Sequence, residues 1–439
     1  MDALLTTQII GGPVPWILCV LSAVFVLLLV LRRPSPRWMV LAAAGILAGA
    51  LIAFVFVLIA DATGMFEIPL PAEVAIWCVA TFAAVGLAIV SLWKTRWRRR
   101  AIAIVGIAVF VITGTVQVNA VFGLNPTIGD LLGVVVRHPI KLPKAHATSS
   151  PTTGEPLAAT WVAPHDMPTI GRVGTVTIPA PVSRFHARPA GLYLPPAALV
   201  KDAPALPLVI MMMGYPGTPN PDPISAVMNR FASQHEGLAP IVVVADQVGT
   251  DGDPACADSA ARGDAATYVK TDVLDWAKSH LHIIQDPRYW VIAGYSNGAT
   301  CAVKFAAQDP DVFRNVLSVS PEEYPGMHYS QTVIQSVYAG DRSAWAADKP
   351  EAILAAHTGS YSGVDAVITT GALDTAFGPA TRSLATSAAA AGMHVTLLTL
   401  PGVAHVGKNL ADGLTAGFAR LAPALGLAAP CEGCSQAAG

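Results

Sequence analysis

The residue of this chain with the strongest chemical signature is Ser296, at the centre of the sequence GYSNG at positions 294–298. An apolar run at 289–293 precedes it, and a helix-compatible run at 299–307 follows it. A serine flanked by glycines at a sharp turn between a strand and a helix is typical of a nucleophile elbow, where a strained backbone exposes the hydroxyl. The N-terminus of the helix directs backbone N–H groups to the same point, which suits an oxyanion. The sequence therefore predicts that Ser296 is a nucleophile.

A serine nucleophile needs a base and an orienting acid, and behind such an elbow they follow in the order Ser, Asp or Glu, His. Two later apolar runs, at 366–370 and 395–400, end shortly before Asp374 and His405. Because the carboxyl ends of parallel strands meet at one edge of a sheet, we expect both side chains beside Ser296. His405 is then the base that takes the serine proton, and Asp374 orients the imidazole and stabilises its positive form.

Other assignments of these residues remain open. Asp374 and His405 could serve only to cap the helices expected near 379–391 and 408–421. Asp341 competes for the role of the acid, whereas Asp365 opens its strand and is expected at the opposite edge of the sheet. The histidines form no trio with the spacing of a metal site, so no metal is expected.

The oxyanion needs a second donor, which usually comes from the loop after the third strand. Here the apolar run 206–213 ends in the sequence GYPG at 214–217, whose small residues let the backbone face a substrate. The backbone N–H groups of Tyr215 and Asn297 are therefore the predicted oxyanion hole.

The N-terminal part of the chain is far more apolar than the rest. Hydrophobic residues make up 53% of the 439 residues and charged residues only 13%, which is unusual for one soluble domain. Four charge-free stretches are long enough to span a bilayer, at 13–31, 40–60, 74–93 and 101–122. A cleaved signal peptide explains only one of them. Their spacing predicts a four-helix transmembrane region built as two hairpins.

The charges between these stretches predict the orientation of the protein. Basic residues gather after the first and third stretches: Arg32, Arg33, Arg37, Lys94, Arg96, Arg98, Arg99 and Arg100. The loop between the second and third stretches instead carries Asp61, Glu67 and Glu73. Because positively charged loops stay in the cytoplasm, we expect a multi-pass cell-membrane protein whose chain beyond 122 is extracytoplasmic.

Beyond residue 122 the pattern of the sequence changes twice. Pro, Thr, Ser and Gly dominate from 123 to 165, which indicates a tether. After it, apolar runs alternate with helical ones: strands are expected at 173–178, 191–194, 206–213, 241–245, 289–293, 315–319, 366–370 and 395–400, and helices near 267–280, 299–308, 379–391 and 408–421. Two antiparallel-looking strands followed by β-α repeats predict an α/β domain with a mostly parallel sheet. The predicted parts are a membrane domain (1–122), the tether (123–165), the α/β domain (166–427) and a tail (428–439).

Four of the six cysteines, Cys256, Cys301, Cys431 and Cys434, fall in the part expected outside the cytoplasm, where disulfides form. Cys256 lies in the long loop after the run 241–245, and Cys301 lies in the second turn of the helix behind Ser296, so we expect a bridge between them. A small terminal disulfide is the simplest interpretation of Cys431 and Cys434, ahead of half a zinc site or a redox motif. Free thiols at Cys256 and Cys301, or a bridge from Cys256 to the tail, remain alternatives.

With these features in hand, the stretch from about 173 to 425 resembles the α/β-hydrolase esterase family that includes esterase D and the antigen 85 mycolyltransferases of actinobacteria. The resemblance rests on the elbow, on the sequences AAQDPDVF at 306–313 and VLSVSP at 316–321, on the turn at 371–374, and on Pro401-Gly402 before His405. The chain departs from the family at three points. Met213-Gly214 stands in place of His-Gly, and Asn297 stands in place of the usual small residue or Met. After the histidine, Val406-Gly407 stands in place of Ser-Trp.

The resemblance implies an α/β-hydrolase fold and a serine esterase or acyltransferase without a cofactor, of an envelope type that acts on lipid or trehalose esters. Together with the four spans, it leads us to expect a membrane-anchored serine ester hydrolase that uses an acyl-enzyme on an envelope lipid ester, including an acyl- or aminoacyl-lipid. An acyltransferase of the mycolyltransferase type is the near alternative, and a non-catalytic envelope scaffold is the alternative of another class. The expected partners are a lipid-linked ester and the membrane; the net charge of −2 gives no reason to expect nucleic acid.

Overall fold

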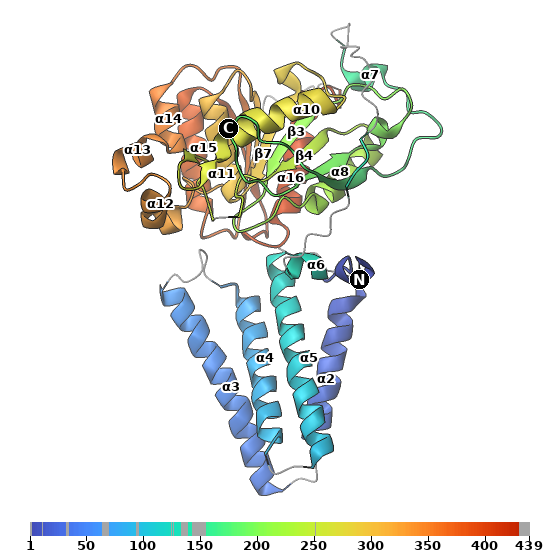
Figure 1. Ribbon diagram of the computed structural model, residues 1–439, viewed down its shortest axis with the longest axis vertical. Helices are drawn as coiled ribbons and strands as arrows, with labels where there is room; N and C mark the ends of the chain where they lie inside the picture. The colour runs from blue at the N-terminus through green and yellow to red at the C-terminus, as the bar shows by residue number, and fades with distance from the viewer. Residues whose placement is uncertain are drawn as a thin grey trace. The chain divides into compact units, whose positions relative to one another are not determined.

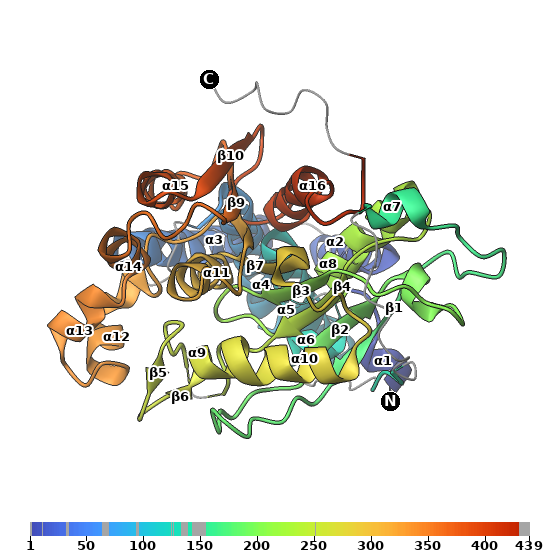
Figure 2. The same cartoon turned by 90° about the horizontal axis from the view of Figure 1, so that it is seen from above.

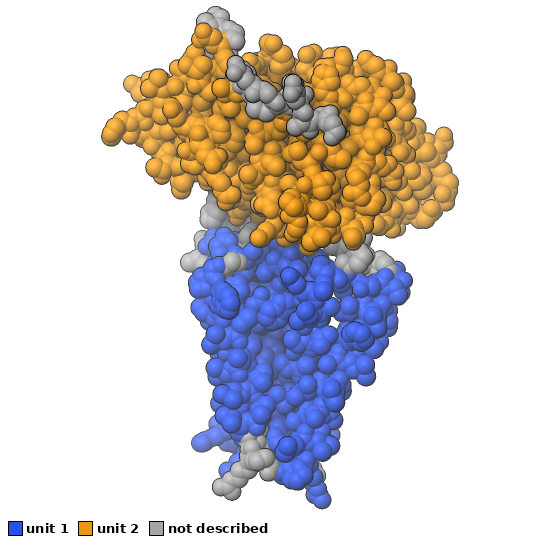
Figure 3. Space-filling view, turned by 180° about the vertical axis from the view of Figure 1, so that it is seen from behind, with its two compact units in different colours: residues 1–136 blue, residues 137–439 orange. Residues whose placement is uncertain are grey.

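The computed structural model of the chain describes residues 2–10, 12–31, 35–63, 70–93, 96–123, 125, 127–132, 139–142, 155–250 and 252–429. The chain forms two compact units, Met1–Val136 and Arg137–Gly439, which Figure 3 shows in different colours. Each unit is described separately below.

The first unit contains the four apolar stretches as helices (Figure 1): α2 (Pro13–Val30), α3 (Pro36–Thr63), α4 (Ala72–Ser91) and α5 (Trp97–Phe122). Two helical turns, α1 (Asp2–Leu5) and α6 (Ile128–Leu131), lie near its ends. By length and composition, each of the four long helices is able to cross a membrane. Most of their large apolar side chains are exposed in the unit itself, as expected of surfaces that face lipid rather than water.

The pairing of these helices differs from the two hairpins that the sequence spacing predicted. The second span, α3, packs on α4, while the first span, α2, packs mainly on α5. A Cβ atom at Gly49 would lie 2.0 Å from the carbonyl oxygen of Phe82, so the backbones of α3 and α4 touch there. Hydroxyls join α2 to α5, with the Oγ of Ser22 at 2.8 Å from the Oγ1 of Thr113. The hairpin expected of the first two spans is therefore wrong, whereas the third and fourth spans, α4 and α5, pack on each other as expected.

The second unit is built around an eight-stranded sheet whose strand order is β1-β2-β4-β3-β7-β8-β9-β10. The strands are β1 (Arg172–Val176), β2 (Ala190–Leu194), β3 (Leu208–Met212), β4 (Ile241–Ala245), β7 (Trp290–Tyr295), β8 (Asn315–Val319), β9 (Asp365–Gly371) and β10 (His394–Leu400). Strand β2 is antiparallel to β1 and β4, and all other pairs are parallel. The eight expected strands and the mostly parallel α/β fold are confirmed.

Helices cover both faces of this sheet (Figure 2). On one face α8 (Asp222–Gln234) contacts α16 (Asn409–Leu421), and on the other α14 (Pro350–Ala356) contacts both α11 (Asn297–Gln308) and α15 (Gly378–Ala391). The helix expected near 267–280 consists of α9 (Ala265–Thr267), a π-helical turn η2 (Tyr268–Val273) and α10 (Leu274–His280). The central strands β3, β4 and β8 are buried along their whole length, as fits apolar runs covered on both sides.

Several elements, most of them short, were not expected from the sequence. They are α7 (Leu157–Thr160), η1 (Pro196–Leu199), a small hairpin of β5 (Asp258–Ser259) and β6 (Gly263–Asp264), η3 (Pro287–Tyr289), η4 (Met327–Tyr329), α12 (Ser330–Ser336) and α13 (Arg342–Ala347), together with α8 and α14 above. Of these, η4, α12, α13 and α14 form an insertion between β8 and β9.

Candidate active site

Ser296 lies at a strained turn between β7 and α11. Its φ of 53° is in the left-handed region, which a residue with a side chain seldom occupies. A Cβ atom at Gly294 would lie 2.0 Å from the carbonyl oxygen of Gly298, and one at Gly298 would lie 2.4 Å from that of Met212. Both flanking glycines are therefore required for the strand and the helix to approach this closely. The local structure is the strand, sharp turn and helix of a nucleophile elbow.

The three residues expected to act together are close in space, although they come from three loops. The Nε2 of His405 lies 3.0 Å from the Oγ of Ser296, and its Nδ1 lies 2.8 Å from the Oδ2 of Asp374. The side chains of His405 and Asp374 are 9% and 1% exposed, so little water competes for these contacts. Oγ, imidazole and carboxylate thus form one continuous chain of hydrogen bonds.

The Asp374 carboxylate is held by more than the histidine, because its Oδ1 also accepts the backbone N–H of Phe377 at 2.9 Å. Burial by itself raises the pKa of this carboxyl, but the contacts with His405, Phe377 and Ser320 outweigh burial and hold the pKa below its ordinary value. Asp374 is therefore ionised beside the imidazole. The hydrogen bond from Phe377 also holds the turn before α15, but α15 has no side-chain cap, so Asp374 does not take the capping role considered above.

The two competing acids lie elsewhere. Asp341 caps α13, since its side chain accepts the backbone N–H groups of Ser343 and Ala344 at 2.9 and 3.0 Å. Asp365 opens β9 and lies 3.4 Å from the Nδ1 of His394, at the opposite edge of the sheet. Neither carboxylate takes the place of Asp374.

Aromatic rings surround the imidazole of His405. The ring of Phe377 lies 4.2 Å away between centroids and that of Tyr295 lies 5.5 Å away, stacked on the imidazole. The Tyr295 hydroxyl donates to the His405 carbonyl at 2.6 Å, which fixes the backbone of the loop. His328, from η4, packs edge-on against Phe377, and its pKa is lowered by burial and by the charge of His405. This second histidine beside the site was not singled out from the sequence.

The two backbone segments expected to stabilise an oxyanion both lie next to Ser296. A Cβ atom on Gly214 would come within 3.3 Å of the Cβ of Ser296, so the loop after β3 passes directly beside the serine. Asn297 is the first residue of α11, which places its N–H at the N-terminus of that helix. The assignment of the N–H groups of Tyr215 and Asn297 as the donors stays a prediction.

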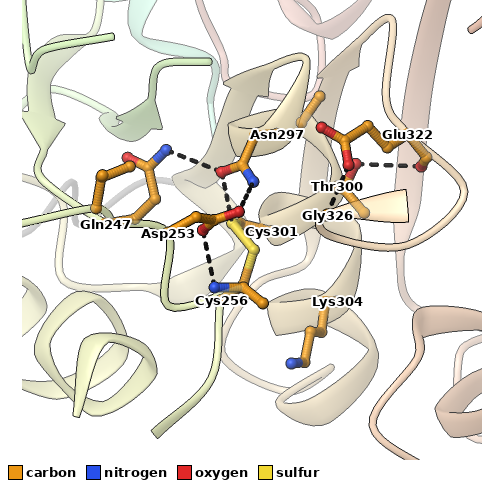
Figure 4. Close-up of a disulfide and its surroundings, with 12 residues drawn as sticks. Gln247, Asp253, Cys256, Asn297, Thr300, Cys301, Lys304, Glu322 and Gly326 are labelled. Carbon is orange, nitrogen blue, oxygen red and sulfur yellow. Dashed lines mark hydrogen bonds between the residues drawn. A yellow bond between two sulfur atoms is a disulfide. The ribbon is translucent and has the colours of Figure 1, made fainter. Parts of the chain in front are cut away.

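The side chain of Asn297 belongs to a buried polar cluster (Figure 4). Its Nδ2 donates to the Oδ2 of Asp253 at 2.9 Å, and its Oδ1 accepts from the Nε2 of Gln247 at 3.3 Å. That Gln247 amide also donates to the carbonyl of Met213, the residue that follows β3, at 2.5 Å. The cluster thus connects both backbone segments of the predicted oxyanion hole.

Asp253 is the centre of this cluster. Its Oδ2 also accepts the hydroxyl of Tyr329 at 2.7 Å, and its Oδ1 accepts the N–H of Ala255 at 2.8 Å. Burial raises the pKa of Asp253, and the hydrogen bonds and the charge of Lys304 offset this only in part. Asp253 lies three residues before Cys256 in a loop noted from the sequence, but no local pattern there predicts a buried carboxylate.

A disulfide joins Cys256 to Cys301, with Cα atoms 5.4 Å apart, and fastens the Asp253 loop to α11 (Figure 4). This is the pairing that the sequence favoured, whereas Cys431 and Cys434 lie outside the described residues. The described part of the chain has no group of three or more His, Cys, Asp or Glu residues placed to hold a metal ion.

A mostly parallel sheet with a serine at the strained turn between β7 and α11 defines the α/β-hydrolase fold. A family model described as "Putative esterase" matches residues 186–399. An uncharacterized protein of Corynebacterium glutamicum is 30% identical over 400 residues, which cover 87% of this chain and 88% of that protein. The chain belongs to this esterase family, and it is a hydrolase with four candidate membrane helices.

Solved structures with a similar chain path include two enzymes. An S-formylglutathione hydrolase from Agrobacterium tumefaciens is 17% identical with a TM-score of 0.49, over 59% of this chain and 98% of that one. The fluorophosphonate-binding serine hydrolase F of Staphylococcus aureus is 14% identical with a TM-score of 0.48, over 57% of this chain and 98% of that one.

Proposed function

We propose that this protein is a serine ester hydrolase whose nucleophile, base and orienting acid are Ser296, His405 and Asp374. The observation that carries the proposal is the continuous hydrogen-bond chain from the Ser296 Oγ through His405 to a buried, ionised Asp374. A non-catalytic scaffold has no need for a strained serine backed by such a chain. The strain at Ser296 therefore favours the enzyme over the scaffold.

The proposed reaction passes through an acyl-enzyme. The Ser296 Oγ attacks the carbonyl carbon of the ester while its proton moves to the Nε2 of His405. The oxyanion receives hydrogen bonds from the N–H groups of Tyr215 and Asn297. The C–O bond to the alcohol then breaks, and the departing alkoxide takes the proton from His405. Water repeats these steps on the acyl-enzyme and releases the acid.

The substrate that we propose is an ester of an envelope lipid, presented to a membrane-anchored enzyme. Support comes from the four helices able to span a bilayer and from the basic loops, which favour an α/β unit outside the cytoplasm. The Cys256–Cys301 disulfide favours the same side, because such bridges persist in oxidising compartments. The division at 122, 165 and 427 into membrane domain, tether, hydrolase domain and tail remains part of this proposal.

Turnover of p-nitrophenyl esters and labelling by a fluorophosphonate, with the full chain in detergent, test the chemistry. Wild type is expected to show both activities and Ser296→Ala neither, while Ser233→Ala on α8 behaves as wild type. Absence of turnover and of labelling in folded wild type contradicts the hydrolase. If an added sugar or glycerol hydroxyl captures the acyl group faster than water does, the protein is an acyltransferase that uses the same acyl-enzyme.

Protease treatment of intact cells tests the placement of the α/β unit. The part of the chain beyond residue 122 is expected to be cleaved, while a cytoplasmic protein of the same cells stays intact. Protection of that part until the membrane is opened contradicts an extracytoplasmic catalytic unit. Comparing the lipids of cells that carry wild type or Ser296→Ala then identifies the ester that accumulates.

A further inference from the structure

The turn that carries the predicted donor Tyr215 is fastened at both of its ends by side chains that the proposed reaction does not use. This turn, residues 214–217, follows β3 and is closed by a hydrogen bond of 2.7 Å from the N–H of Gly217 to the carbonyl of Gly214. It passes directly beside Ser296, since a Cβ atom on Gly214 would lie 3.3 Å from the serine Cβ. The side chains that hold the turn therefore also set where the Tyr215 N–H lies relative to the serine.

Gln247 holds the first end of the turn. Its Nε2 lies 2.5 Å from the carbonyl oxygen of Met213, the residue before the turn, and 3.3 Å from the Oδ1 of Asn297 (Figure 4). Because a carbonyl oxygen only accepts, the NH₂ end of the amide must face Met213, and its second hydrogen is left for Asn297. One buried amide thus joins the start of the turn to the residue that carries the other predicted donor.

Arg188 holds the other end of the turn, because its Nη2 donates to the carbonyl of Gly217 at 3.1 Å. The guanidinium is itself held by the buried Asp246, with Nη2 at 2.6 Å from Oδ1 and Nε at 3.0 Å from Oδ2. The backbone N–H of Arg188 donates to the same carboxylate at 2.6 Å. A planar guanidinium gripped at two points has a fixed direction, so the N–H that reaches Gly217 is aimed by Asp246.

The topology of the sheet brings both supports to the turn. Asp246 and Gln247 are the two residues that follow β4, and β4 pairs with β3 on one side and with β2 on the other. Because β2 runs antiparallel to β4, Arg188, two residues before β2, comes to the same edge of the sheet. The strand order β2-β4-β3-β7 therefore places Arg188, the end of β4, the turn and Ser296 next to one another along this edge.

We propose that Gln247 and the Arg188–Asp246 pair are positioning residues of the esterase, which hold the turn 214–217 so that the Tyr215 N–H points at the oxyanion. This inference rests on the proposed function. The three side chains act through the backbone of the turn, not on the reacting atoms themselves. An oxyanion donor must lie about 2.7–3.1 Å from the oxygen of the transition state, and a turn held at both ends keeps the N–H there without rearrangement as negative charge develops.

The test compares Gln247→Met and Arg188→Lys with wild type, as full chains in detergent, on p-nitrophenyl esters and with an alkyl trifluoromethyl ketone. The Ser296 Oγ adds to the carbonyl carbon of this ketone and gives up its proton to the base, and the oxyanion persists because no group can leave. Gln247→Met keeps the length of the side chain without its donor, and Arg188→Lys keeps the charge without the guanidinium fork. Gln308→Met is the matched control, since Gln308 is a hydrogen-bonded amide at the opposite end of α11 from Ser296.

We expect Gln247→Met to lower kcat about tenfold and Arg188→Lys about threefold, with KM nearly unchanged, because a misplaced donor loses part of the stabilisation that one oxyanion hydrogen bond gives. The inhibition constant of the ketone should rise by the same factor as kcat/KM falls. The acid limb of the kcat/KM profile should stay in place, since His405 and Asp374 are unchanged. Gln308→Met should alter none of these quantities.

The inhibition constant separates positioning from a merely structural role, because loss of folded enzyme lowers kcat and leaves the inhibition constant unchanged. If Gln247→Met matches Gln308→Met in both quantities while wild type is active, the inference is overturned and the proposed function stands. A fall in kcat without a weaker inhibition constant overturns the inference in the same way. If folded wild type has no turnover, both are overturned. If Gln247→Met does not fold, Arg188→Lys must show the matched changes, and wild-type values there overturn the inference.

Discussion

Two buried aspartates flank the strand that carries Ser296, and their environments differ. Asp374 follows β9, two strands away on one side, and its pKa lies below the ordinary value. Asp253 follows β4, two strands away on the other side, and its pKa is raised, chiefly by burial. Asp374 accepts hydrogen bonds from His405 and Phe377, and Asp253 accepts them from Asn297, Tyr329 and Ala255, but only Asp374 faces a group that becomes a cation during the proposed reaction. Neutral hydrogen-bond donors around a buried carboxyl therefore do not lower its pKa as much as a neighbouring positive charge does.

The two sides also differ in how their loops are held. On the Asp374 side, hydrogen bonds and the packing of Phe377 on His405 connect the loops that follow β8, β9 and β10, which allows a proton and a charge to move. On the Asp253 side, the Cys256–Cys301 disulfide fastens the loop to the helix behind the serine. The first arrangement suits reacting groups, and the second suits a backbone that must stay in place.

The largest difference is expected from replacing each aspartate by asparagine. Asp374→Asn should lower kcat by about 10³-fold or more, since the imidazole loses its orienting charge. Asp253→Asn should lower kcat by about tenfold or less, because it disturbs only the backbone donors beside the serine. Ester turnover by folded variants in detergent measures both. A larger loss for Asp253→Asn than for Asp374→Asn would reverse the assigned roles.

The disulfide should matter more for stability than for chemistry. For a loop of 45 residues, chain entropy gives a stabilisation of about 4 kcal/mol. The double variant Cys256→Ala/Cys301→Ala should therefore lower Tm clearly while changing kcat less than about threefold, because neither sulfur touches the reacting atoms. Cys78→Ala, which removes a free thiol from α4, is the control. An unchanged Tm with a lost kcat would show that the bridge serves the chemistry directly.

The smallest expected difference is the pH dependence of stability. Asp374, with its lowered pKa, contributes stability above the ordinary carboxyl pKa of about 3.9 and loses it as the pH falls through the folded-state value. Asp253, with its raised pKa, contributes stability below that pH and loses it as the pH rises through the folded-state value. The decrease in Tm caused by Asp253→Asn should thus become smaller as the pH rises from about 4 to about 7. The decrease in Tm caused by Asp374→Asn should instead become larger as the pH rises from about 3 to about 7. The exposed Asp275→Asn is the control, and equal trends for the two buried aspartates would remove the contrast.

Much of the protein was determined by local sequence. Apolar runs bounded by turn residues gave the eight strands, because a strand buried on both faces leaves a continuous apolar run. The glycines around Ser296 specified the elbow, since their Cβ atoms have no room. The order of Ser296, Asp374 and His405 relative to the strands was enough to expect them at one edge of the sheet. The four apolar helices followed from length and composition alone.

Only the tertiary structure decided how these parts meet. Asn409 bonds to Ser320 across 89 residues and Asn297 to Asp253 across 44, and no local pattern encodes such contacts. The short helices α12 to α14 escaped prediction because each has seven residues or fewer and gains its stability from packing. The pairing of α2 with α5 depended on hydroxyl contacts between helices distant in the chain. Local sequence sets which elements form, whereas partners across the fold depend on where the loops bring polar groups together, away from water.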